Sequence, residues 1–148
     1  MDLLNKIIEG SSIIVEGKEY KVLGKGYYVT QKEPNALYAK ILLPNHYVLV
    51  ISPSDSIAYF GQNRGLIEEF NSFDDKVYYN NKCFEQVNHD YQILIHLLFG
   101  SPLEVEGEVE FWDYEYNNEI ISIAEVSRNK LRADVVAQYI DYANIDVV

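Results

Sequence analysis

The hydrophobic residues of this chain fall into short runs that turn-forming residues separate. Segment 12–30 has the pattern of two strands joined by a tight turn at 16–18, where Gly17 supplies the positive φ that such a turn needs. Further along, the apolar runs 37–43 and 47–52 lie on either side of a Pro-Asn-His turn. This punctuation predicts antiparallel strands joined by hairpins.

Two later segments share a Tyr-Asn-Asn sequence, at 79–81 and at 116–118. Asparagine tolerates the left-handed region of backbone conformation better than other non-glycine residues, so each Asn-Asn pair predicts a two-residue hairpin turn. Roughly eight to ten short strands result over the whole chain. The predicted fold class is therefore mainly β, or β-rich α+β, with antiparallel hairpins forming a barrel, a roll or a sandwich.

Helical signals are few, and one or two short helices are expected. Asp2 is placed to begin a helix that ends before Gly10, and 64–70 has the composition of a turn or two. Segment 129–143 carries apolar residues at a spacing of four, which suits a helix, but its valines and tyrosines equally suit a strand. Residues 1–148 are expected to form a single β-rich domain, in which 61–76 is the place where two lobes would divide.

Charge changes this picture, because the net charge of −11 is concentrated in one part of the chain. Between Lys82 and Arg128 there are ten acidic residues and no lysine or arginine. Such a surface repels nucleic acid and anionic membranes and attracts basic partners. We therefore expect no nucleic-acid partner, and a basic surface on another protein is the favoured partner.

The acidic window contains a strand-like segment, 103–111, in which acids and hydrophobes alternate. Side chains alternate across a strand, so the acids share one face, and this face is either a carboxylate site or the solvated side of a half-buried strand. The acids are Glu104, Glu106, Glu108 and Glu110.

Beyond Phe111 the alternation is reversed. Trp112, Tyr114 and Tyr116 take the positions of the preceding glutamates, and Asp113 and Glu115 take those of the preceding hydrophobes. Either a β-bulge shifts the phase, or the strand passes from one covered face to the other. A bulge beside aromatics and acids would favour a pocket.

The sequence contains little that indicates a metal site, a disulfide, a cofactor or a catalytic motif. His89, Asp90 and His96 do not have zinc-ligand spacing, and Cys83 is the only cysteine, so neither a metal site nor an internal disulfide is predicted. No phosphate loop or nucleophile elbow is present, and no cofactor or catalytic residue is assigned. The N-terminal segment lacks the features of a signal peptide, and no apolar run is long enough to span a bilayer. We expect a cytoplasmic protein without membrane insertion.

The order of segments resembles DUF4178, a family of bacterial proteins known as a domain of unknown function. The similarity lies in "IIEGSSIIVEGKEYKVLGKGYY" at 7–28, in "GEVEFWDYE" at 107–115, in "ISIAE" at 121–125 and in "IDV" at 145–147. The chain departs from the family in the middle, where "YVLVISPSD" lacks the tryptophan of the family's strand. The resemblance implies a small β-rich fold and transfers neither an activity nor catalytic residues.

Together these patterns favour a non-catalytic acidic interaction module, such as an inhibitor or immunity-type partner that covers a basic site. Its expected surface comprises Glu104, Glu106, Glu108, Glu110, Trp112, Asp113, Tyr114, Glu115 and Tyr116. Tyrosine and tryptophan often anchor interfaces, and the acids would steer the partner. The alternative is a small enzyme or ligand-binding protein that uses Asp113 or Glu115 in a β pocket, which requires a closed cavity and a carboxylate of raised pKa.

The first alternative predicts that reversing the charge of the four glutamates changes which proteins are captured. The variant Glu104→Lys, Glu106→Lys, Glu108→Lys and Glu110→Lys should lose basic partners in affinity capture, because steering and rim contacts both depend on charge. An unchanged set of captured proteins would contradict the interaction-module hypothesis.

Overall fold

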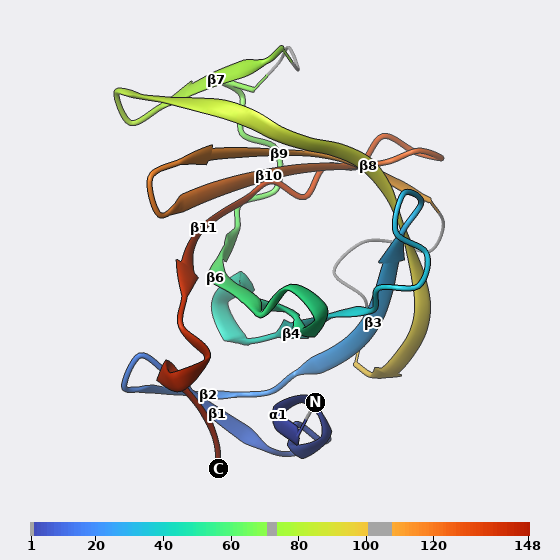
Figure 1. Ribbon diagram of the computed structural model, residues 1–148, viewed down its shortest axis with the longest axis vertical. Coiled ribbons are helices and arrows are strands. Elements are labelled where there is room, and N and C mark those ends of the chain that lie inside the picture. The colour runs from blue at the N-terminus through green and yellow to red at the C-terminus, as the bar shows by residue number, and fades with distance from the viewer. Residues whose placement is uncertain (1, 71–73, 101–107) are drawn as a thin grey trace.

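The computed structural model describes residues 2–70, 74–100 and 108–148. These residues form an antiparallel eight-stranded barrel with two covering layers outside it (Figure 1). Around the barrel the strands are β3 (Gly24–Thr30), β4 (Tyr38–Leu42), β5 (Tyr47–Ser52), β6 (Ile57–Asn63), β11 (Val135–Ile140), β10 (Glu119–Val126), β9 (Val109–Tyr116) and β8 (Lys82–Phe99). Pairing of β8 with β3 closes the barrel. The mainly β prediction is confirmed, and the architecture is the barrel.

The remaining elements lie outside the barrel. The short strands β1 (Ser12–Val15), β2 (Lys18–Lys21) and β12 (Ile145–Val147) form a three-stranded sheet, and α1 (Asp2–Lys6) lies beside it. The strand β7 (Lys76–Tyr79) pairs with the beginning of β8. The described ranges also contain three short 3-10 segments, η1 (Pro44–His46), η2 (Pro53–Asp55) and η3 (Tyr142–Asn144). In Figure 1 the sheet and α1 lie on one side of the barrel and β7 on the other.

The predicted turns occur where the sequence placed them. Gly17 has φ 84° between β1 and β2, and both Asn80 and Asn81 have positive φ between β7 and β8. Asn117 likewise has positive φ, of 52°, between β9 and β10. The two alternatives for 129–143 are now decided, because Val135–Ile140 is the strand β11, paired on both sides with β10 and β6. The strands that flank 64–75, β6 and β7, belong to the same sheet.

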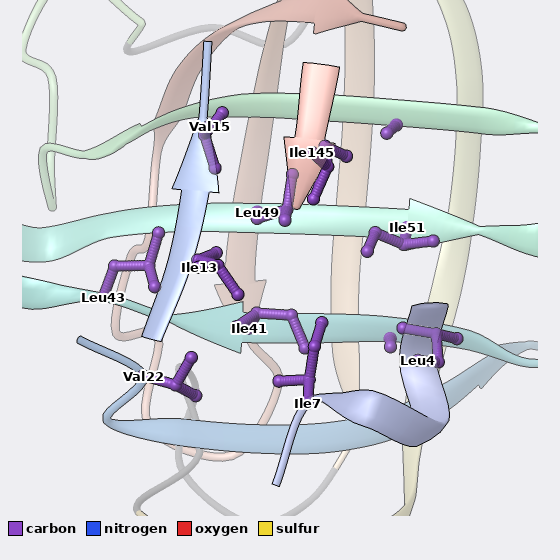
Figure 2. Close-up of a cluster of buried hydrophobic side chains, with 12 residues drawn as sticks. Leu4, Ile7, Ile13, Val15, Val22, Ile41, Leu43, Leu49, Ile51 and Ile145 are labelled. Carbon is purple, nitrogen blue, oxygen red and sulfur yellow. The ribbon is translucent and has the colours of Figure 1, made fainter. Parts of the chain in front are cut away.

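The first covering layer packs on the outer face of β4 and β5. Figure 2 shows Leu4 and Ile7 of the N-terminal segment and Ile13 of β1 meeting Ile41 and Leu49 of the barrel wall. All five side chains are almost completely buried. Because the inner faces of β4 and β5 are covered as well, both strands are nearly continuous apolar runs rather than alternating ones.

The second layer covers the outer face of β9 and β10 on the opposite side. Phe70, Val77 and Phe84 pack there against Tyr114 and Ile123, which are fully buried. A separate set of side chains fills much of the barrel interior: Val48, Val50, Ile120, Val135 and Ala137, together with Val109, Phe111, Ala124, Val126 and Ala133. The barrel wall is therefore hydrophobic on both faces along much of its circumference.

A buried lysine helps to anchor the first layer. Lys25 of β3 is 4% exposed, and its ammonium donates to the carbonyl oxygens of Leu4 and Ile7, the latter at 3.0 Å. Leu4 lies in α1 and Ile7 directly follows its end, and the Leu4 carbonyl also accepts from the backbone N–H of Ile7 at 3.2 Å. Burial lowers the pKa of Lys25.

A buried ion pair anchors the second layer. Asp134 is fully buried and accepts hydrogen bonds from Nε of Arg132 at 2.9 Å and from its Nη2 at 2.7 Å. It also accepts from the backbone N–H of Ile67 at 2.9 Å, which ties 64–70 to the start of β11. Burial raises the pKa of Asp134, and the arginine opposes this shift. Removing one partner of such a pair leaves a buried charge uncompensated.

The wall of the barrel also depends on a close approach of two backbones at Gly61. A Cβ at this position would lie 2.1 Å from the carbonyl oxygen of Val136, which no side chain can tolerate. At Gly26 of β3 the nearest atom to such a Cβ would be Cδ1 of Leu94 at 3.3 Å, the end of a flexible side chain.

We predict that Gly61→Ala lowers the free energy of unfolding by about 3 kcal/mol or more, because β6 must move away from β11. The matched variant Gly26→Ala should cost less than about 1 kcal/mol, since only one side chain must adjust. Urea unfolding of both variants measures these costs, and equal costs would contradict the close-approach explanation.

Candidate functional site

The barrel contains a cavity of about 300 Å³. Its lining comes from the inner faces of β4, β5, β6, β8, β9, β10 and β11, from the end of β3 and from the connection after it. The exposed residues Glu33 and Asp55 line its rim, so the cavity opens to solvent at that end of the barrel. Its volume lies at the small end of the range for ligand pockets.

Strand β9 places Asp113 in this cavity. Its odd-numbered residues point inward, so Phe111 and Asp113 both line the cavity, whereas Trp112 and Tyr114 pack in the outer layer. The pairing of β9 with β10 continues without a break from Val109 to Tyr116. The sequence left open either a β-bulge or a regular strand that passes from one covered face to the other. The structure shows the regular strand, and the layer that covers each face of β9 changes along its length.

A register break does occur, but on the neighbouring strand. The pairing of β8 with β9 shifts between Gln86 and Asn88, and Asn88 lies opposite Asp113. Val87 and Asn88 both line the cavity. The irregularity beside the cavity therefore belongs to β8 and not to the segment around Phe111 and Trp112, where the sequence had offered a bulge as one alternative.

Asp113 is half-buried and lines the cavity, and its Oδ1 is buried. This burial raises its pKa to about 6. A hydrogen bond from Ser122, its cross-strand neighbour on β10, and the positive charge of Lys40 lower the pKa, while the charge of Glu115 raises it. Desolvation is the dominant effect.

Lys40 brings the positive charge into the barrel from β4. It is 6% exposed and lines the same cavity as Asp113. Its Nζ lies 4.8 Å from the centre of the Tyr28 ring, a cation–π distance. The Tyr28 ring is in turn stacked on Tyr38, with centroids 5.7 Å apart. Opposite charges and aromatic rings therefore share one enclosed site.

Gln92 supplies a second polar group to the cavity from β8. It is 4% exposed, and its Oε1 accepts a hydrogen bond of 2.6 Å from the hydroxyl of Tyr38. Among the residues that the structure describes, Nε2 of Gln92 and Oδ1 of Asp113 are buried without a hydrogen-bond partner. Buried polar atoms without partners are rare and costly, so two in one cavity indicate a site built for a ligand.

The second predicted carboxylate, Glu115, is held by a neighbour. The hydroxyl of Tyr139 on β11 donates a short hydrogen bond to its Oε2. Burial raises the pKa of Tyr139, and the bond to Glu115 adds to the effect. The Tyr139 ring also lines the cavity and contacts Tyr59 edge-on. Glu115 thus fixes the position of one aromatic wall of the site.

The expected interaction surface is only partly an exposed surface. Trp112 is 8% exposed and Tyr114 is fully buried, so the expectation that both are exposed is wrong. Their outer face is covered by the second layer, which the pattern of β9 alone does not reveal. Tyr116 is half-buried and its ring packs against Phe84.

The glutamates of the same surface have different environments. Glu108 is exposed, and Glu110 lies 2.7 Å from Nε2 of His89, whose ring is stacked on Trp112 with centroids 5.0 Å apart. Glu104 and Glu106 lie outside the described residues. The described members thus form one exposed and one half-buried carboxylate on the outer side of β9.

Sequence reasoning missed Lys40, Gln92 and Tyr38. The available signal was a polar residue inside an apolar strand, as at Lys40 in "YAKILL". Such a residue identifies a site only when the fold is known, because it is the barrel that brings Lys40 within electrostatic reach of Asp113. In the described ranges no three His, Cys, Asp or Glu side chains are grouped as a metal ion would require.

Comparison of the chain with protein-family models, curated proteins and solved structures finds no match. Within the described part of the chain, no helix has the length and apolar character needed to cross a membrane.

The raised pKa of Asp113 predicts a pH-dependent stability. The folded protein binds this proton more tightly than the unfolded chain, so the contribution is complete below about pH 4 and is lost as the pH rises through about 6. Its size is on the order of 3 kcal/mol. Asp113→Asn removes the titration, so its free energy of unfolding relative to the wild type should increase between pH 4 and pH 7.

Urea unfolding at four pH values measures this difference. Asp146→Asn, at an exposed acid on β12, makes the same change of charge away from the cavity and serves as the control. Parallel curves for Asp113→Asn and the wild type would contradict the assignment of the shifted pKa.

Proposed function

We propose that the protein is a non-catalytic binding protein that holds a small organic molecule inside its barrel. The observation that carries the proposal is the barrel cavity, in which a carboxylate oxygen of Asp113 and the amide nitrogen of Gln92 are buried and lack partners among the described residues. Ligand sites are characteristically apolar cavities with a few convergent polar groups. This is the ligand-binding form of the second alternative from the sequence.

The composition of the lining supports binding rather than covalent chemistry. The described residues that line the cavity include no histidine and no cysteine, so the common pairs of nucleophile and base are not formed there. Valine, isoleucine, alanine and phenylalanine side chains make up much of the wall, with Tyr38, Tyr59 and Tyr139 among them. An apolar wall favours a ligand with a hydrophobic body.

A second candidate function remains the acidic interaction module. The observation that favours it is the stretch between Lys82 and Arg128, which carries ten acids and no lysine or arginine. Glu85 and Glu108 of this stretch are exposed. With Trp112 and Tyr114 buried, such a surface has fewer aromatic anchors, which is why we place it second. Membership of DUF4178 stays a prediction that rests on the sequence resemblance alone.

The proposed function predicts that small organic fragments bind the wild-type protein and that filling the cavity abolishes their binding. Ala124→Leu on β10 and Val50→Phe on β5 each add side-chain volume to the cavity wall. Ala143→Leu, at an exposed position of η3, is the matched control. Ligand-observed NMR with a fragment library measures binding, and the dispersion of amide signals identifies which variants are folded.

We expect fragment binding by the wild type and Ala143→Leu, and its loss in each folded cavity variant. The proposal would be wrong if no fragment bound the wild type. It would be equally wrong if bound fragments were unaffected in a cavity variant that is folded.

A further inference from the structure

The polar groups of the cavity define the chemical class of the ligand. We infer that the barrel binds an electrically neutral molecule with an apolar body, one hydrogen-bond donor directed at Asp113 and one acceptor directed at Gln92. This inference rests on the proposed function and adds the charge and the hydrogen-bonding pattern of the ligand.

The first step concerns the acceptor on the ligand. The hydroxyl of Tyr38 donates to Oε1 of Gln92 at 2.6 Å, which fixes the orientation of the amide. Its Nε2 then points its hydrogens away from Tyr38, and this atom is buried without a partner among the described residues. An amide N–H only donates, so the ligand must offer an acceptor such as a carbonyl oxygen.

The second step concerns the donor on the ligand. Asp113 uses the hydroxyl of Ser122 as one partner, while its Oδ1 has none in the described part of the chain. A carboxylate oxygen accepts hydrogen bonds, so the ligand must bring an N–H or an O–H to this atom. Because the group is desolvated, a ligand lacking this donor would leave a buried oxygen unsatisfied.

The third step concerns charge. The positive charge of Lys40 already acts on Asp113. The other buried carboxylate of the cavity, Asp90, already accepts hydrogen bonds from the backbone N–H groups of Lys32 and Tyr91. A cationic ligand at Asp113 would therefore meet the lysine ammonium, and an anionic ligand would meet the carboxylate. In a site of low dielectric constant both repulsions are strong. A neutral ligand avoids them and still satisfies the two polar atoms.

The fourth step concerns position. On β8, Gln92 pairs with Val109 of β9, and Asn88 pairs with Asp113, so the two anchors lie four residues apart along the barrel wall. At a strand rise of about 3.3 Å per residue, their backbones are about 13 Å apart. Phe111 lies between them on the inner face of β9. The donor and acceptor therefore belong at different ends of an apolar ligand body.

Four probes of similar size and different chemistry test the inference: 4-(hydroxymethyl)acetophenone, 4-(hydroxymethyl)benzoate, protonated 4-(hydroxymethyl)benzamidine and 4-ethyltoluene. The first is neutral, with a hydroxyl donor and a carbonyl acceptor at opposite ends of its ring, and the others are an anion, a cation and an apolar analogue. We expect the neutral ketone to bind the wild-type protein about tenfold or more tightly than each of the others, since a desolvated polar site rejects analogues that leave it unpaired. Dissociation constants from NMR titration at pH 7 measure the ratio.

Variants locate the contacts. Gln92→Leu should weaken binding of the neutral ketone about tenfold and leave binding of 4-ethyltoluene unchanged or tighter. Gln138→Leu, at an exposed position of β11, makes the same substitution outside the cavity and should have no effect. Should Gln92→Leu fail to fold, the ratios measured on the wild type still decide the matter.

The possible results separate the two proposals. Binding of the anionic or the cationic probe as tight as that of the neutral ketone would overturn the neutral-ligand inference while leaving small-molecule binding intact. The same holds if library fragments bind in the cavity but the neutral ketone does not, or if folded Gln92→Leu binds the neutral ketone normally. Failure of every fragment to bind would instead overturn the proposed function itself.

Discussion

The pairing of β8 with β3 is the constraint on which the rest of the structure depends. It joins the last and first strands of the barrel through registers from Lys25 opposite Phe99 to Thr30 opposite Gln92, with two breaks that let β8 bend around the wall. Without this closure the inner faces of β4, β9 and β10 would be one side of an open sheet. Closure turns them into the walls of an enclosed space, where Lys40 and Asp113 are held in low dielectric surroundings.

The two outer layers let the barrel keep a polar interior. Much of the apolar burial lies outside it, where α1 and the three-stranded sheet pack on β4 and β5, and where Phe70 and Val77 pack on β9 and β10. Lys25 and the pair of Arg132 with Asp134 hold these layers in place. The stability that the layers provide offsets the cost of keeping Gln92 and Asp113 partly unsatisfied inside. Buried polar groups that are left partly unsatisfied are typical of functional sites.

Local sequence patterns determined the turns and most strands of this fold. Positive φ at Gly17, Asn80 and Asn117 follows from residue chemistry that acts over two or three positions, so the hairpins were predictable. The conformation of segment 129–143 was not predictable, because its apolar spacing suits both a helix and a strand. Pairing with β6 and β10 made it a strand, and pairing is a contact between distant residues.

The sequence by itself determined that the two faces of β9 differ, with Asp113 and Glu115 on one and Trp112 and Tyr114 on the other, because side chains alternate along a strand. Only the tertiary structure decided which face is inside. The outer layer buried the aromatic residues that composition had suggested were exposed, and barrel closure enclosed the carboxylates. Lys40, Gln92 and Asp113 come from strands far apart in the chain, so no local pattern could place them in one cavity.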